Sequence, residues 1–207
     1  MLLHEILQNG RGEDIAVIDR GRRITYDELR EALRASRDRF YAAGIRAHDH
    51  VALFSHNRVE LLVAYLAVNS LGAVAVPLNY QLSVREVAYI IKDAGVRHLV
   101  TEKELPLESH LGQQGYGGEL HQLPLLDVMK PASAMPAPKL SNIFSEENPC
   151  VIIYTSGTTG APKGAVLSHR NQCVNAHQVV EHHSITPNDK VLCVLPMYHC
   201  FAWTCSV

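Results

Sequence analysis

The stretch HVALFSHNRVELLVAYLAVNSLGAVAVPL, residues 50–78, decides the fold class of this chain. His50 to Phe54 predicts a short buried strand, because four apolar residues follow one another there. Residues 58–71 are long enough for a helix, and Gly72 ends it. Ala73 to Val76 then predicts a second strand. A buried strand, a helix and another buried strand joined by short turns indicate a parallel β-α-β unit.

Part of this stretch, Leu61 to Leu78, also has the length of a membrane span. Polar and helix-ending residues interrupt it and divide it into a helix and a strand; these are Asn69, Ser70, Gly72 and Pro77. The pair Asn57 and Glu60 has the spacing of a capping box at the start of the helix. We therefore expect no transmembrane segment.

The rest of the chain repeats this pattern of strands and helices. Ile15–Asp19 and Arg23–Thr25 predict a hairpin, and a T-x-x-E pattern at Thr25 opens a helix that ends at Gly44. Further on we expect a helix over 83–95, strands over 97–101, 150–154 and 164–168, a helix over 169–183, and a strand over 191–195. The predicted fold class is α/β, with largely parallel strands flanked by helices.

Between residues 102 and 149 the periodicity fades and prolines become frequent. This segment is either a linker between subdomains or an irregular excursion from one domain. We favour the excursion, because Leu123, Leu125, Leu126 and Val128 could lie against the sheet.

The composition excludes several classes of protein. The 207 residues hold 19 Lys and Arg against 21 Asp and Glu, a formal charge of −2, so a nucleic-acid partner is not expected. Hydrophobic residues make up 47%, the ordinary globular share. The N-terminus lacks the basic region of a signal peptide, and the five cysteines include no CxxC pair, so reduced thiols and a cytoplasmic location are expected.

Twelve histidines raise the question of a metal site. Cys173 and His177 are four residues apart on a predicted helix, but no spacing completes a set of four ligands. We expect a solvated helix face there and no protein-bound metal.

The segment most informative about chemistry is YTSGTTGAPKG, Tyr154–Gly164. Three glycines, four hydroxyl side chains and Lys163 follow an apolar strand, a composition that suits the binding of phosphate oxygens. An ordinary turn-rich hairpin loop is the alternative. A Walker-type loop is excluded because Pro162 precedes the lysine and a strand follows it. A nucleophile elbow is excluded because Tyr154 stands where it requires glycine.

This segment resembles the signature of the adenylate-forming acyl-CoA synthetases, the AMP-dependent synthetases and ligases. That signature is an aromatic residue followed by T-S-G-[ST]-T-G-x-P-K-G, and every defined position matches. Three further stretches resemble family elements: ITYDEL at 24–29, GAVAVPLN at 72–79 and PMYH at 196–199. The resemblance extends over essentially all 207 residues and is weakest over 102–149.

The resemblance implies a reaction in two steps. A carboxylate attacks the α-phosphate of ATP, giving acyl-adenylate and pyrophosphate, and the thiol of coenzyme A then displaces AMP. The residues matching the family's ATP-binding loop are Thr155, Ser156, Gly157, Thr158, Thr159, Gly160 and Lys163. Because one lysine cannot balance the charge of a triphosphate, Mg²⁺ is implied as well.

The resemblance also places the acyl pocket after PMYH. It implies that His199 lies near the carboxylate of the acid and, with Lys163, belongs to the catalytic residues. Phe201, Ala202 and Trp203 would line the substrate tunnel, and the H-x-x-A-W arrangement is similar to that of the fatty-acyl branch. The alternative is that the two aromatic residues belong to the core. A fatty acid is therefore the expected substrate, with an aryl or other acid as the alternative.

The family's chains are longer than this one. The resemblance implies that residues 1–207 are a partial N-terminal, AMP-binding domain, and we expect the small C-terminal domain with its catalytic lysine not to be part of this chain. We expect this part alone not to turn over substrate, which leaves a non-catalytic nucleotide-binding module as a second reading. Our hypothesis is that sheet edges and apolar faces cause association with a second copy or with a complementary chain.

Overall fold

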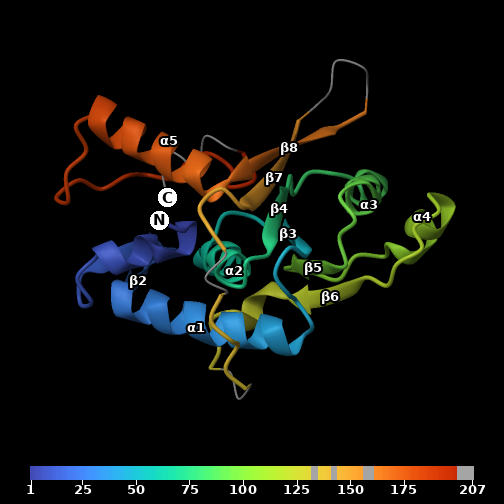
Figure 1. The fold of residues 1–207 in the computed structure, drawn as a ribbon, viewed down its shortest axis with the longest axis horizontal. Coiled ribbons are helices and arrows are strands. Elements are labelled where there is room, and N and C mark those ends of the chain that lie inside the picture. The colour runs from blue at the N-terminus through green and yellow to red at the C-terminus, as the bar shows by residue number, and fades with distance from the viewer. Residues whose placement is uncertain (132–134, 141–143, 156–160, 200–207) are drawn as a thin grey trace.

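The computed structural model of the protein describes residues 1–131, 135–140, 144–155 and 161–199 (Figure 1). The elements follow in the order η1 (Leu3–Asn9), β1 (Ile15–Asp19), β2 (Arg22–Thr25), α1 (Tyr26–Ala42), β3 (His50–Phe54), α2 (Val59–Ser70), β4 (Val74–Leu78), α3 (Val84–Asp93), β5 (His98–Thr101), α4 (Glu108–Gln113), β6 (His121–Pro124), η2 (Leu125–Asp127), β7 (Pro149–Thr155), β8 (Lys163–Ser168) and α5 (His169–His182).

Six strands of the described residues form one sheet in the order β6-β5-β3-β4-β7-β8. Strands β3 to β7 run parallel to one another, and β8 pairs with β7 antiparallel. Strands β1 and β2 form a separate antiparallel hairpin. The predicted α/β class is confirmed, including the largely parallel sheet flanked by helices.

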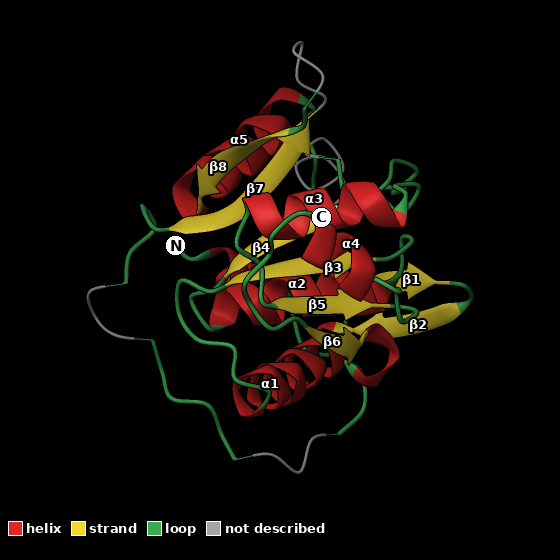
Figure 2. Cartoon of the chain, turned by 90° about the vertical axis from the view of Figure 1, so that its right-hand side faces the viewer, coloured by secondary structure: helices red, strands yellow, loops and turns green. Residues whose placement is uncertain are grey.

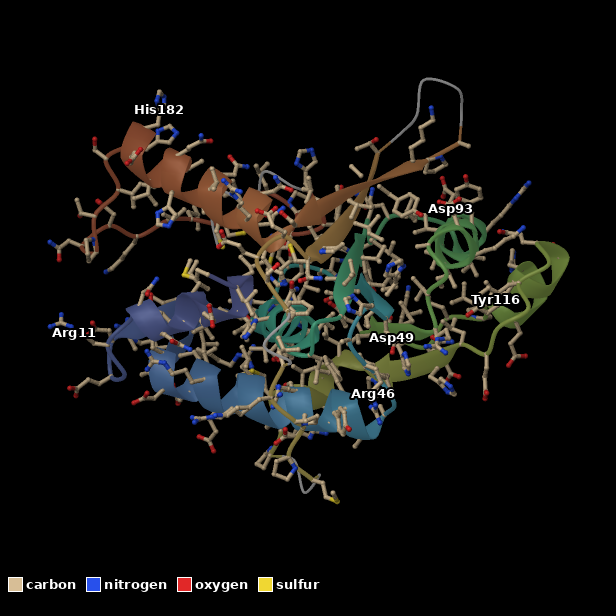
Figure 3. The ribbon with its side chains drawn as sticks, in the orientation of Figure 1. Arg11, Arg46, Asp49, Asp93, Tyr116 and His182 are labelled. Carbon is tan, nitrogen blue, oxygen red and sulfur yellow. The ribbon has the colours of Figure 1, made fainter. Side chains whose placement is uncertain are left out.

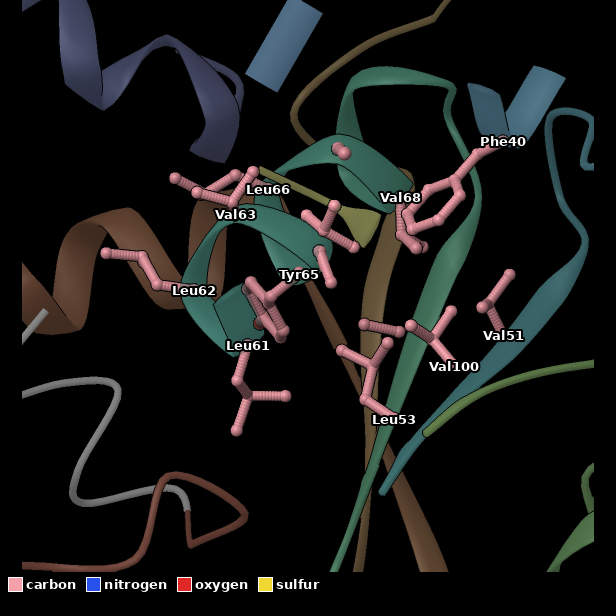
Figure 4. Packing of buried hydrophobic residues seen from close by; sticks show 14 of the residues in the cluster. Phe40, Val51, Leu53, Leu61, Leu62, Val63, Tyr65, Leu66, Val68 and Val100 are labelled. Atoms are coloured by element: carbon pink, nitrogen blue, oxygen red, sulfur yellow. The ribbon is translucent and has the colours of Figure 1, made fainter. Parts of the chain in front are cut away.

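Helices cover both faces of the sheet (Figure 2). Along the buried strands the side chains alternate between two cores, one on each face. Val51 and Leu53 of β3 point to the core beneath α1 and α2 (Figure 4), whereas Ala52 and Phe54 point to the core beneath α3 and α4. A strand buried on both faces needs a continuous apolar sequence, and this explains the HVALF run.

Helix α2 is apolar on all sides because it lies between the sheet and the layer formed by α1 and η1. All of its residues, Val59–Ser70, are buried. Its caps, Arg58 and Leu71, are the two ends of the predicted helix, and among the described residues no helix is long and apolar enough to cross a membrane.

The capping box predicted at Thr25 is confirmed, and the one predicted at Asn57 is wrong. The Thr25 hydroxyl accepts a hydrogen bond from Glu28 N, and the Glu28 carboxylate accepts one from Thr25 N. The expected box at Asn57 does not form, since α2 begins after Arg58 without a side-chain cap. The side chain of Asn57 instead bonds to the backbone near residue 196, as described below.

The segment 102–149 is more regular than its sequence suggests. It contains α4 and the edge strand β6, which extends the central sheet beside β5. Leu125 and Val128 are fully buried, as expected of an excursion that packs on the domain, but Leu126 is 51% exposed and the expectation for it was wrong. The guanidinium groups of Arg37 and Arg39 on α1 donate to the carbonyl oxygens of Ala137, at 3.0 Å, and Pro131, at 3.1 Å, and hold the later part of the segment.

The strand expected over Val191–Leu195 is absent. This segment forms no regular element in the described part of the chain, and Leu192 and Val194 are 80% and 73% exposed. A strand needs a neighbour to satisfy its backbone groups. The apolar sequence is present here, but none of the sheet strands described above pairs with it.

Candidate functional site

The phosphate-binding segment predicted from the sequence joins two strands of a hairpin. Strand β7 ends at Thr155, β8 begins at Lys163, and these two residues are cross-strand partners. The side chains of both are exposed. Residues Ser156, Gly157, Thr158, Thr159 and Gly160 of the predicted set lie outside the described residues, so only the two ends of the segment are placed.

The hairpin begins within the central sheet and carries these two ends outward. Val151 of β7 pairs with Ala75 of β4 in the sheet, and the described ends of β7 and β8 extend beyond the neighbouring strands (Figure 1). Because β7 runs parallel to its neighbour β4, Thr155 lies on the side of the sheet where the parallel strands have their carboxyl ends. In open α/β sheets this edge is the usual place for a ligand.

The glycine that follows Lys163 has a packing reason. Gly164 lies opposite Tyr154, and a Cβ on Gly164 would lie 2.7 Å from Ile152 Cγ2 and 3.1 Å from the Tyr154 ring. A larger residue would therefore displace one of these neighbours. The absence of a side chain at Gly164 leaves room for the Tyr154 ring, in the cross-strand pair next to Thr155 and Lys163.

The second predicted element, Pro196–His199, forms a turn, in which His199 N donates to Pro196 O at 2.9 Å. Met197 is buried, at 5% exposure, and His199 is exposed. The predicted pocket residues Phe201, Ala202 and Trp203 lie outside the described residues.

Asn57 holds this turn against the end of β3. Its side-chain amide donates to Leu195 O at 2.7 Å and accepts from Met197 N at 2.7 Å. Two hydrogen bonds to alternate residues fix both the position and the direction of the segment that leads to His199. Sequence reasoning placed Asn57 at a helix start and so missed this function.

The turn that carries Asn57 is held by hydrogen bonds to the Glu102 carboxylate. Glu102, directly after β5, accepts hydrogen bonds from Ser55 Oγ at 2.5 Å and His56 N at 2.9 Å. Burial raises the pKa of the Glu102 carboxyl, but these hydrogen bonds and the Arg58 guanidinium outweigh burial, and the net pKa is lowered. The carboxylate is therefore ionised near neutral pH and holds the turn that carries Asn57.

The structure brings Thr155 and Lys163 together and places His199 on a separate segment tied to the end of β3. Among the described residues no group of three or more His, Cys, Asp or Glu side chains could hold a metal ion. Cys150, Cys173 and Cys193 are thiols. Sequence reasoning also missed Asp93, whose carboxylate accepts a hydrogen bond from Tyr154 Oη at 2.5 Å.

Comparisons with known proteins concern the family and the fold of the chain. A family model described as AMP-binding enzyme matches residues 5–207. A 3-hydroxybenzoate/4-hydroxybenzoate–CoA ligase of Thauera aromatica is 32% identical over 96% of this chain, and a feruloyl-CoA synthase of an Amycolatopsis species is 30% identical over 90% of it. These alignments cover 39% and 37% of the two relatives, so the chain spans less than half of their length.

Solved structures match the fold. The o-succinylbenzoate CoA synthetase of Bacillus subtilis in complex with its acyl-adenylate intermediate is 27% identical, with a TM-score of 0.82 over 98% of this chain and 52% of that one. The N-terminal subdomain of Klebsiella oxytoca NpsA, 24% identical with a TM-score of 0.76, shares the fold. The match of the family model over nearly the whole chain confirms the resemblance seen in the sequence: the chain belongs to the AMP-binding enzyme family.

Proposed function

We propose that this chain is the ATP-binding part of an AMP-forming acid–CoA ligase. In the first step a carboxylate oxygen attacks the α-phosphorus of ATP, the bond to the bridging oxygen breaks, and pyrophosphate leaves. In the second step the thiolate of coenzyme A attacks the acyl carbon and AMP leaves. The observation that carries the proposal is the hairpin that presents Thr155 and Lys163 together at the carboxyl edge of the sheet.

Lys163 would act on the charge that develops as pyrophosphate leaves. Its ammonium group is exposed at the hairpin tip and can approach phosphate oxygens, and the Thr155 hydroxyl beside it can donate a hydrogen bond. The loop residues Ser156 to Gly160 would supply further donors, as their sequence predicts.

Mg²⁺ belongs to the proposal as a counter-ion of the triphosphate, which carries about four negative charges that one lysine cannot balance. The described residues offer no cluster of three metal-binding side chains. We therefore propose that Mg²⁺ enters on the phosphate oxygens of ATP, and we assign it no protein ligand.

For the substrate we propose a carboxylic acid with an aromatic ring. The relatives reported above are named for hydroxybenzoates, ferulate and o-succinylbenzoate. The fatty acid expected from the H-x-x-A-W arrangement is the second candidate, and it rests on Ala202 and Trp203, which lie outside the described residues. A non-catalytic nucleotide-binding module remains the alternative for the chain itself.

The test begins with ATP binding. Isothermal titration of the chain with ATP and Mg²⁺ should show binding, and Lys163→Ala should raise the Kd at least ~10-fold, the effect of one charge-assisted hydrogen bond. Lys190→Ala, at another exposed lysine, is the matched control and should leave the Kd unchanged. Equal affinities for the wild type and Lys163→Ala would contradict the assigned role of Lys163.

The substrate class is tested by pyrophosphate release. The whole ligase that contains this chain is assayed with 3-hydroxybenzoate, ferulate and saturated fatty acids of increasing length, because the chain alone is not expected to turn over substrate. We expect release with the aromatic acids. Release with fatty acids only would overturn the aromatic assignment, and ATP binding without release with any acid would favour the non-catalytic module.

A further inference from the structure

Helix α3 lies beside the β7–β8 hairpin and contacts it on both sides of the predicted phosphate-binding segment. Tyr89 and Asp93 are one helical turn apart on α3, so their side chains share a face. Figure 3 labels Asp93 on α3. Asp93 contacts Tyr154, the residue before Thr155. Tyr89 contacts Pro162, the residue before Lys163.

The contact between Asp93 and Tyr154 is a strong hydrogen bond. Tyr154 Oη donates to Asp93 Oδ2 at 2.5 Å, the short distance typical of a hydroxyl that donates to a carboxylate. Burial, and next the hydrogen bond to Asp93, raise the pKa of Tyr154 well above its ordinary value. The phenol therefore remains protonated and keeps donating throughout the neutral range.

The contact between Tyr89 and Pro162 is weaker and lies just before the other strand, β8. Tyr89 Oη donates to Pro162 O at 3.4 Å, near the limit of a hydrogen bond. A cavity of about 680 Å³ separates part of α3 from Ala161 and Pro162. Close packing therefore does not fix α3 against Ala161 and Pro162, and the Tyr89 hydrogen bond bridges this gap. On β7, Ile152 and Tyr154 pack in the same core as α3, and the Asp93 hydrogen bond adds to that packing.

We propose that Asp93 and Tyr89 are positioning residues that hold the hairpin against α3 and so place Thr155 and Lys163 for the phosphates of ATP. Each bond ends on the residue next to one of that pair. Hydrogen bonds next to both Thr155 and Lys163 would hold these two residues in one position relative to α3. The consequence for ATP rests on the function proposed above, whereas the anchoring itself does not.

The anchoring is tested without nucleotide, by hydrogen exchange of the backbone amides of residues 154, 155, 163 and 164. Tyr154→Phe and Asp93→Ala should each raise exchange at these amides at least ~3-fold and leave the amides of β3 and β4 unchanged. Asp93→Asn keeps an acceptor and should restore part of the protection. The double variant should show no more than the larger single effect, because both changes break the same bond.

Tyr116→Phe is the matched control. It removes one tyrosine hydrogen bond of similar length, from Tyr116 Oη to Val96 O at 2.7 Å, and Tyr116 lies by α4, away from the hairpin (Figure 3). This variant should leave exchange in the hairpin unchanged. Unchanged exchange in Tyr154→Phe and Asp93→Ala, or an equal rise in Tyr116→Phe, would overturn the anchoring.

The consequence for ATP is tested on the same variants. Tyr154→Phe should raise the Kd of ATP about 3- to 10-fold, less than Lys163→Ala, because the phenol acts only through its neighbours. If exchange rises and the Kd does not change, the hairpin is anchored but the anchor does not serve the phosphates, and that part of the proposal is wrong. If the wild type binds no ATP, the proposed function fails while the exchange result still decides the anchoring.

Discussion

Acidification should destabilise the protein through His169, the first residue of α5. This imidazole is fully buried. Its Nδ1 accepts a hydrogen bond from Leu3 N at 3.0 Å, and the Phe144 ring packs edge-on against it with 5.6 Å between ring centroids. An imidazole that accepts through Nδ1 is neutral, with its proton on Nε2. Protonation would break the bond to Leu3 and place a positive charge in an apolar site.

The size of the effect follows from the pKa. Burial, followed by the charges of His4 and the N-terminal amine, lowers the pKa of His169 from 6.5 to about 4. Because the folded pKa lies below the unfolded one, the unfolded chain takes up this proton first. The stabilisation is complete above pH 6.5, decreases as the pH falls toward 4, and amounts to about 3 kcal/mol at 1.36 kcal/mol per pH unit.

The assay is urea unfolding between pH 8 and pH 4.5, comparing the wild type with His169→Gln. Glutamine can accept the bond from Leu3 N but does not titrate. Burial also lowers the pKa values of His4 and His98, and the difference between the two proteins removes their contribution. We expect the stability of the wild type to fall relative to the variant by about 1 kcal/mol for each pH unit below 6.

His177→Gln, at an exposed histidine of the same helix, is the control and should follow the wild type. Parallel stability profiles of the wild type and His169→Gln over this range would refute the reasoning. So would a wild type that gains stability relative to His169→Gln as the pH falls.

Two further predictions concern the end of the described chain. Asn57→Ala removes the hydrogen bonds to Leu195 O and Met197 N, and urea unfolding should show that the free energy of unfolding falls by about 1–3 kcal/mol. Asn57→Asp keeps only the acceptor and should have an intermediate stability. An Asn57→Ala variant as stable as the wild type would contradict the assignment. The exposed Leu192 and Val194 predict self-association that grows with concentration; light scattering should detect it, and Leu192→Lys should reduce it, whereas a wild type that stays monomeric at high concentration would contradict the prediction.

Features whose contacts are local could be predicted from the sequence. The capping box at Thr25 involves residues only three positions apart and forms as expected, and the helix expected from residue 83 begins there with a box of the same spacing. The buried strands β3 and β4 and the helix between them follow from apolar runs and from Gly72. Each of these signals is complete within a few residues of the chain.

Features whose partners are distant could not be predicted in this way. Asn57 has the spacing of a helix cap, but its hydrogen bonds are made to residues about 140 positions later. Val191–Leu195 has the composition of a strand, but a strand forms only where a neighbour accepts it. Strand β6 shows no clear alternation because it lies at the sheet edge, where its burial is partial. The bond between Asp93 and Tyr154 joins two elements that nothing in either sequence relates.

The same distinction applies to the site. Lys163 and the loop before it could be assigned because their chemistry is concentrated in eleven consecutive residues. Yet their position in space depends on groups elsewhere in the chain, namely Asp93 on α3 for the hairpin and Asn57, held by Glu102, for the turn that carries His199. Asn57 follows β3, and Asp93 bonds to Tyr154 of β7, which belongs to the same sheet. The parallel sheet therefore sets the distance between the two parts, and the supporting residues set the orientation of each.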